Sequence, residues 1–180
     1  MKIYLKQICM IGNIKYLLFF LLCFSCQNRE KKTALGNELI SENLPILLDN
    51  LDYFKTIDNP VVGVYQFVGE IKQDQSIVIK KFQEKYNLSN EKILNSSIKL
   101  EKIQKKINNY SVFLDTDNSF KKRKDTIKVS FVNFIISKNN QYASIEVVKS
   151  LGNGAKFEIY YFKQVNGKWI FDGKQLIAVG

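Results

Sequence analysis

Histidine is absent from this chain of 180 residues, and cysteine occurs only three times, at Cys9, Cys23 and Cys26. Without an imidazole, the chain has no Ser–His or Cys–His nucleophilic pair, no histidine general base and no imidazole ligand for a metal. Because all three cysteines lie near the N-terminus, the chain after Cys26 has neither a disulfide nor a reactive thiol. The fold must therefore depend on its hydrophobic core, and most nucleophilic catalysis is excluded.

Glycine-rich phosphate loops are also missing, and the single calcium-like stretch is a poor match. Asp115 and Asp117 have the spacing that opens a calcium loop, but Phe120 stands where such loops have glycine and Thr126 where they have glutamate. We therefore expect a plain loop at 115–125, no metal and no cofactor. Only carboxylate, lysine or tyrosine chemistry remains, so we expect a protein that is not an enzyme. A carboxylate-based hydrolase is kept as one alternative.

The N-terminal segment has the composition of a secretory signal peptide. Lys2, Lys6 and Lys15 precede an apolar run at 16–24, and no acidic residue lies among them. The run would form only about 13 Å of helix, whereas a bilayer core requires about 20 residues, so it is too short to span a membrane. A basic segment followed by a short apolar one is typical of a signal that is removed from the mature protein.

The junction Phe24-Ser25-Cys26, which follows Leu21-Leu22, resembles the lipobox of bacterial lipoproteins, where a small residue precedes an acylated cysteine. This resemblance implies cleavage after Ser25, acyl chains such as palmitate on Cys26, and a location in the cell envelope. Two or more acyl chains are enough to anchor a protein stably in a membrane. The membrane is therefore an expected partner, reached through Cys26.

Neighbouring residues refine this assignment. Cys23 stands where the lipoprotein class usually has leucine, and Leu22 is too large to allow cleavage before Cys23. Gln27 replaces the aspartate that often accompanies retention at the inner membrane, which by analogy implies the outer membrane. We expect a signal peptide at 1–25, a lipidated flexible tether at 26–37 and one domain at 38–180.

The net charge of +10 indicates anionic partners, and the basic run 121–124 is a candidate contact for phosphates or lipid headgroups. Most lysines are scattered along the chain, however, which is typical of a hydrated surface. We therefore expect an unidentified small ligand or a protein as the second partner, and no nucleic acid.

The first part of the domain contains one predicted helix and one predicted strand. Leu47, Leu51 and Phe54 recur at helical spacing within 42–58, where Pro45 suits a first-turn position. The segment 61–71 is rich in β-branched and aromatic residues and is predicted to be a strand.

Two further segments show helical patterns. Residues 76–86 are ambiguous between helix and strand, and we favour helix. A longer helix is predicted to begin near Ser89, where serine is a suitable N-cap. Its apolar stripe would consist of Leu100, Ile103, Ile107 and Tyr110.

From residue 127 onward, four strand-like runs are separated by Asn139-Asn140, Asn153-Gly154 and Asn166-Gly167. Asn-Gly favours a two-residue hairpin turn, so three successive hairpins are predicted. The predicted register opposes Lys138 to Gln141, Gly152 to Ala155, and Val165 to Lys168. It gathers one apolar face: Val132, Phe134, Ile136, Ala143, Ile145, Val147, Tyr160, Phe162, Trp169 and Phe171. The predicted fold class is α+β, with N-terminal helices packed on one face of a C-terminal four-stranded antiparallel meander.

Helices that precede an antiparallel meander ending in a tyrosine-rich strand and an Asn-Gly-Lys-Trp hairpin are similar to the nuclear-transport-factor-like (SnoaL-like) cone fold. The resemblance covers about 127–179. It implies a small ligand held between sheet and helices, or a dimer formed through the sheet. No catalytic motif of that family matches, so no functional residue is carried over.

The same register places Asn133, Glu146, Tyr161 and Asp172 in one row on the other face of the meander. Polar groups framed by apolar neighbours are typical of a site that orients a ligand. The hypothesis is that Glu146 and Asp172 anchor charge and that Tyr161 is the platform. The leading function is a lipid-anchored envelope module that binds a ligand or partner without catalysis. The alternative is an immunity- or exclusion-type lipoprotein that inhibits another protein.

Overall fold

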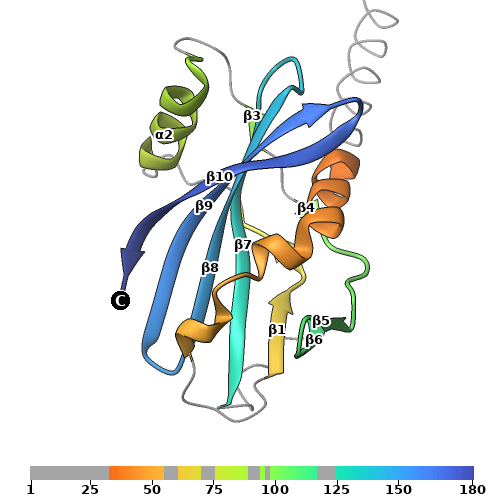
Figure 1. The fold of residues 1–180 in the computed structure, drawn as a ribbon, viewed down its shortest axis with the longest axis vertical. Helices are drawn as coiled ribbons and strands as arrows, with labels where there is room; N and C mark the ends of the chain where they lie inside the picture. The colour runs from red at the N-terminus through yellow and green to blue at the C-terminus, as the bar shows by residue number, and fades with distance from the viewer. Residues whose placement is uncertain (1–32, 55–60, 70–75, 89–93, 96–97, 117–124) are drawn as a thin grey trace, which may run out of the picture.

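The computed structural model describes residues 33–54, 61–69, 76–88, 94–95, 98–116 and 125–180. The strands are β1 (Val61–Tyr65), β2 (Phe67–Val68), β3 (Leu94–Asn95), β4 (Ile98–Lys99), β5 (Lys106–Ile107), β6 (Tyr110–Asp115), β7 (Thr126–Ile136), β8 (Tyr142–Leu151), β9 (Gly154–Val165) and β10 (Lys168–Val179). One curled sheet has the order β10-β9-β8-β7-β1-β6-β5, with β3 also paired to β7, and β2 pairs with β4 (Figure 1). The sheet is mixed, because β1 runs parallel to both β6 and β7.

Short turns with positive φ angles connect β7 to β10. Asn140, Gly152 and Asn166 have φ values of 57°, 56° and 51°, a region that asparagine and glycine tolerate. The predicted pairing of Val165 with Lys168 is confirmed. The predicted pairing of Gly152 with Ala155 is wrong, since Ser150 lies opposite Ala155. The turn consists of Gly152 and Asn153, because Gly-Asn satisfies a two-residue hairpin as Asn-Gly does.

A β-bulge at Asn133 reverses the side-chain alternation of β7. Asn133 has a φ of 54°, and the register between β7 and β8 shifts between Val132 and Ile135. Before the bulge Phe131 faces the main core, and after it Phe134 does. The prediction that Val132 belongs to the apolar face is therefore wrong. A second bulge lies in β10, where Gly173 has a φ of 110° and the register shifts between Phe171 and Lys174.

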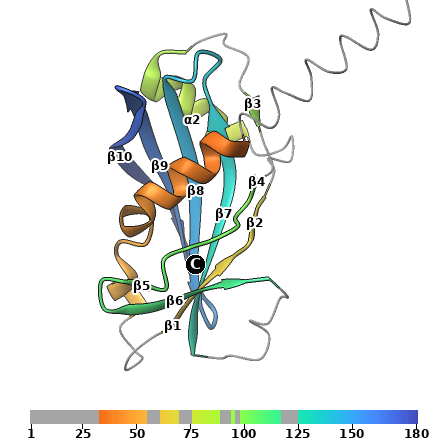
Figure 2. The same ribbon diagram turned by 90° about the vertical axis from the view of Figure 1, so that its right-hand side faces the viewer.

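A helix at 33–47 lies against the face around which the sheet curls (Figures 1 and 2). Its buried leucines and isoleucine recur three, four and one residues apart, as one face of a helix requires: Leu39, Ile40, Leu44, Leu47 and Leu48. Asn43 Nδ2 lies 3.4 Å from the carbonyl oxygen of Trp169 and so connects this helix to β10. Asn50, with a φ of 53°, follows the helix, and the short 3-10 helix η1 (Leu51–Phe54) adds two residues to the core.

The second helix, α2 (Ser76–Tyr86), packs on the opposite face of the sheet near one end (Figure 1). Val78 and Phe82 are buried there against Ile135, Ile159 and Tyr161. The helix favoured for 76–86 is thereby confirmed. Within the described ranges, neither helix has the length and apolar character needed to cross a bilayer.

The predicted fold class is wrong. β7 to β10 do pair in sequence order, but they form only part of a larger mixed sheet that continues through β1, β6 and β5 as a half-barrel. The two helices of the described residues lie on opposite faces rather than together on one. The error arose because β1 pairs in parallel with β6 and β7, which lie far from it in sequence. No local sequence pattern predicts a pairing between such distant segments.

Two predicted helices also need correction. The helix expected from Ser89 does not form in its described part, which contains β3, β4, β5 and the start of β6. Ile98 and Leu100 are both buried at the two-residue spacing of a strand, and Asn108, with a φ of 52°, turns the chain between β5 and β6. The helix expected at 42–58 is found at 33–47, so it includes 33–37 of the predicted tether. The basic run 121–124 lies outside the described residues.

Candidate functional site

The four residues predicted to form one recognition row fall into two separate pairs. Tyr161 lies opposite Ser144 rather than Glu146, because the β8–β9 turn is displaced from its predicted position. Asn133 and Glu146 form one pair, and Tyr161 and Asp172 belong to the other, beside α2. The role of these residues in recognition stays a prediction.

Asn133 and Glu146 form a buried polar pair across β7 and β8. Asn133 Nδ2 donates to Glu146 Oε2 at 2.5 Å, and the two residues are only 1% and 8% exposed. Burial raises the pKa of Glu146, and the hydrogen bond from Asn133 partly opposes this effect. The pair joins the β7 bulge to β8 and leaves little carboxylate surface for a ligand.

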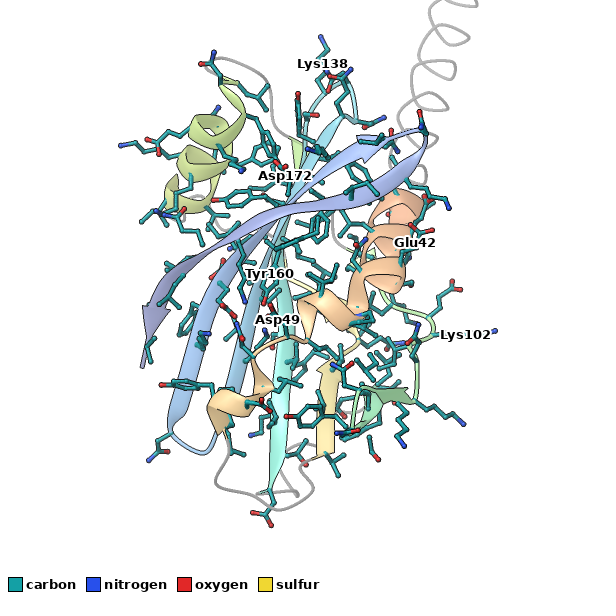
Figure 3. All side chains as sticks on the ribbon, in the orientation of Figure 1. Glu42, Asp49, Lys102, Lys138, Tyr160 and Asp172 are labelled. Atoms are coloured by element: carbon teal, nitrogen blue, oxygen red, sulfur yellow. The ribbon has the colours of Figure 1, made fainter. Side chains whose placement is uncertain are left out.

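A groove of about 430 Å³ lies between α2 and the bulge of β10. Its lining combines charged, amide and aromatic groups: Lys81, Glu84, Lys85, Tyr161, Gly173, Lys174 and Gln175. Gly173 permits the bulge, because a φ of 110° is strained for any residue with a Cβ. Asp172 precedes this glycine and lies on β10 near α2 (Figure 3). The groove therefore exists because β10 bends beside the helix.

Tyr161 forms part of the base of this groove. It is 4% exposed, and its hydroxyl donates to Gln175 Oε1 at 3.2 Å. Burial raises the pKa of Tyr161, and the charge of Glu84 raises it further, so the phenol keeps its proton. The ring lies 5.8 Å from Lys85 Nζ and edge-on to Tyr86. Tyr161 is thus a fixed and almost fully covered part of the groove floor, with Lys85 over its ring.

Asp172 is neutralised by cations from two elements. Its carboxylate lies 3.1 Å from Lys163 Nζ on β9 and 3.6 Å from Lys85 Nζ on α2. Partial burial acts to raise the pKa of Asp172, but the Lys163 hydrogen bond and the charges of both lysines hold it below its ordinary value. Asp172 is therefore a bridge between the helix and the sheet rather than an open anchor for a cation.

Lys81 and Lys85 lie four residues apart on α2 and both line the groove. In the described part of the chain, no carboxylate lies within ion-pair distance of Lys81, whereas Glu84 pairs with Lys80 at 3.9 Å. Lys174 turns to the other face of the sheet, where its Nζ lies 2.6 Å from Asp49 Oδ2. The groove lining thus combines two ammonium groups, the Glu84 carboxylate and the Gln175 amide over an almost fully covered tyrosine. Its two lysines suit the anionic group of a small ligand.

A second polar cluster lies on the face that carries the helix at 33–47. Lys149 is fully buried, and its Nζ lies 2.6 Å from the Asp49 carbonyl oxygen, 2.8 Å from the Tyr160 hydroxyl and 3.3 Å from Glu158 Oε2. The Tyr160 hydroxyl also donates to Asp49 Oδ1 (Figure 3). Glu158 gains further pairs with Lys156 at 3.2 Å and Lys174 at 3.4 Å.

Electrostatics show that this cluster is structural. Burial lowers the pKa of Lys149, and the charges of Glu158 and Asp49 act against that effect. Burial also raises the pKa of Tyr160, as do its hydrogen bond to Asp49 and the charge of that residue. Because Lys149 is inaccessible and held by several acceptors, it is not available as a nucleophile. It attaches the turn after the helix at 33–47 to the middle of the sheet.

Sequence reasoning identified Tyr161 and Asp172 but missed Lys81, Lys85 and Gln175. Two lysines four residues apart in a segment favoured as helix were the available signal.

The described ranges contain no cluster of three or more acidic, histidine or cysteine side chains suited to a metal ion. No family model, curated protein or solved structure matches the chain.

Proposed function

We propose that this protein is a lipid-anchored lipoprotein of the cell envelope that binds a small anionic ligand without catalysis. The observation that carries the binding role is the groove between α2 and β10, which Lys81 and Lys85 line and where Lys85 lies over the Tyr161 ring. The lipobox at Phe24-Ser25-Cys26 supports the anchor, and it belongs to 1–32, which lie outside the described residues.

The chemistry of the groove favours binding of an anion. Ammonium groups form strong charge-assisted hydrogen bonds to phosphate or carboxylate oxygens, and a tyrosine face packs against planar or apolar groups. A volume of about 430 Å³ lies in the range of small-molecule sites. Asp172, beside the groove, has a lowered pKa and two cationic partners, so it is a weak proton acceptor at neutral pH. Glu84, the carboxylate that lines the groove, pairs with Lys80 at 3.9 Å. These properties support a module that holds a ligand.

The anchor is tested by Cys26→Ser in cells fed a labelled fatty acid. We expect the variant to lose the label and to leave the membrane fraction in processed form or to accumulate as precursor. Cys23→Ser is the matched control, and it should be labelled and retained like the wild type. Label and membrane retention in the processed Cys26→Ser variant would overturn the proposed anchor.

The groove is tested by Lys81→Gln combined with Lys85→Gln. Native mass spectrometry of the protein released gently from envelopes should detect a bound small molecule in the wild type and at least tenfold less in the double variant, because the loss of even one charged contact costs about 1.5–3 kcal/mol. Lys102→Gln combined with Lys105→Gln removes the same charge from two exposed lysines outside the groove and is the control. Equal occupancy in both double variants, or no bound molecule in the wild type, would contradict the proposal.

A further inference from the structure

One face of the β9–β10 hairpin tip carries exposed aliphatic side chains together with lysines. Lys163 lies opposite Ile170, and Val165 lies opposite Lys168, so these four side chains share the face that points away from the helix at 33–47. Val165 and Ile170 are 44% and 45% exposed. The segment 162–171 contains no acidic residue. The tip therefore displays two aliphatic side chains between two lysines.

The hairpin is held rigidly, so this face has a fixed direction. Trp169, on the opposite side of the same strand, is buried in the main core with 3% exposure. The Gln164 amide donates to the carbonyl oxygen of Gln141 at 2.8 Å, which ties the tip to the β7–β8 turn. That turn adds another exposed cation, Lys138, at the same end of the molecule (Figure 3).

The β9–β10 hairpin lies at the same end of the molecule as the start of the helix at 33–47, which the proposed anchor precedes. The helix at 33–47 starts at the end of the molecule that carries the β7–β8 and β9–β10 turns, whereas the β8–β9 turn lies at the far end (Figures 1 and 2). A chain spans at most about 3.6 Å per residue, so the short segment from Cys26 to Thr33 reaches at most about 25 Å. An acylated Cys26 would therefore hold this end of the molecule close to the bilayer.

We propose that the β9–β10 hairpin tip, through Val165, Lys168 and Ile170, docks on the anionic membrane surface into which Cys26 is anchored. This inference rests on the lipid anchor of the proposed function. Lysines near an anionic leaflet are attracted to its headgroups, and aliphatic side chains enter the boundary between headgroups and acyl chains.

The test uses the full lipidated protein in vesicles of equal parts phosphatidylglycerol and phosphatidylcholine that carry a lipid-borne quencher. A fluorophore is attached to Gln141→Cys, beside the tip, and in a separate sample to Asn153→Cys in the β8–β9 turn at the far end. The acylated Cys26 does not react, so each variant has a single labelled thiol. We expect strong quenching at position 141 and little at position 153.

Docking is separated from simple tethering by lengthening the tether with about 20 glycine and serine residues, which form a flexible coil. Quenching at position 141 should persist with the long tether. In that background, Lys168→Gln should weaken docking about fivefold, and Val165→Ser combined with Ile170→Ser should nearly abolish it. Phosphatidylcholine vesicles should give the same loss as Lys168→Gln or a larger one.

Three results would overturn the inference. Equal quenching at both positions, or quenching that these substitutions leave unchanged, would show that the tip does not dock. Quenching that rises with the number of proteins per vesicle would identify a second copy of the chain as the partner of this face. Failure of the protein to float with any vesicle would remove the anchor itself, and the docking proposal with it, whereas normal flotation without tip-dependent quenching would refute docking alone.

Discussion

Replacing Lys149 by methionine tests how far a buried cation holds this fold together. Lys149 Nζ contacts the Asp49 carbonyl oxygen, Asp49 Oδ1, Glu158 Oε2 and the Tyr160 hydroxyl, all within 3.3 Å. Methionine has a similar length and fits the same space, but it supplies no donor. The change therefore leaves a buried glutamate and a half-buried aspartate with one cation fewer.

The expected loss in unfolding free energy depends on the ion pairs that remain after Lys149 is replaced. Removing one member of a buried ion pair costs about 3–5 kcal/mol when the other charge is left unpaired. Here Glu158 keeps Lys156 and Lys174, and Asp49 keeps Lys174. Methionine also avoids the free-energy cost of burying an ammonium group. The same burial lowers the pKa of Lys149 in the wild type. We therefore expect a loss of about 2–4 kcal/mol in the free energy of unfolding.

Urea unfolding of wild type and variant measures this loss, with Lys156→Met as the matched control. Lys156 pairs with the same glutamate, but its side chain keeps 14% exposure and it is not among the contacts of Asp49 or Tyr160, so its loss should cost less than that of Lys149. The pKa values of Asp49 and Glu158 are lowered in the folded protein, so their contribution is present above their ordinary values of 3.8 and 4.5 and is lost as pH falls through the folded values. The cost of Lys149→Met should shrink accordingly in acid. Equal costs for both variants at neutral pH would refute the reasoning.

Three further predictions concern the sheet. Phe162→Ala should cost about 3–5 kcal/mol in urea unfolding, because Phe162 is fully buried; a loss below about 1 kcal/mol would mean that this face is not core. Glu146→Gln should gain stability relative to wild type as pH rises above the ordinary Glu146 pKa of 4.5, since the raised folded pKa makes the wild-type contribution fall while the unfolded carboxyl ionises and the folded one keeps its proton; a pH-independent difference would contradict this. Asp172→Asn frees two lysines and should strengthen binding of an anionic groove ligand in native mass spectrometry, whereas weaker binding would indicate a cationic ligand.

The sequence predicted the parts of the fold that depend on local patterns. The Asn166-Gly167 turn could be placed because both residues tolerate positive φ and strand-like runs flank them. The helix 76–86 could be favoured from the spacing of Val78, Phe82 and Tyr86. Both features depend on interactions between residues close in the chain.

The errors have specific physical causes. Pro45 was assigned to a first turn, but it lies near the C-terminal end of its helix, where burial of Leu44, Leu47 and Leu48 outweighs the missing backbone donor. The segment 98–110 has apolar residues that fit both a helix and alternating strands, and only its pairing partners decide between them.

The candidate site was predicted in part for a related reason. Tyr161 and Asp172 share a sheet face that alternation alone assigns. The displaced β8–β9 turn separated them from Glu146, and a one-residue difference in a turn cannot be read from alternation. The lysines of α2 join the site through tertiary packing, which no spacing within the chain encodes.

The parallel strand β1 has a consequence for the order of assembly. β1 lies between β6 and β7, both of which follow it much later in the chain. In a polypeptide that emerges N-terminus first, Val61 to Tyr65 appear before either of their hydrogen-bonding neighbours exists, whereas the β7–β10 hairpins close between adjacent segments. Long-range pairings form slowly because a large loop must close first. We expect the centre of the sheet to be completed last, with an apolar strand exposed in the meantime, and a chain crossing a membrane would need protection from aggregation until β1 inserts.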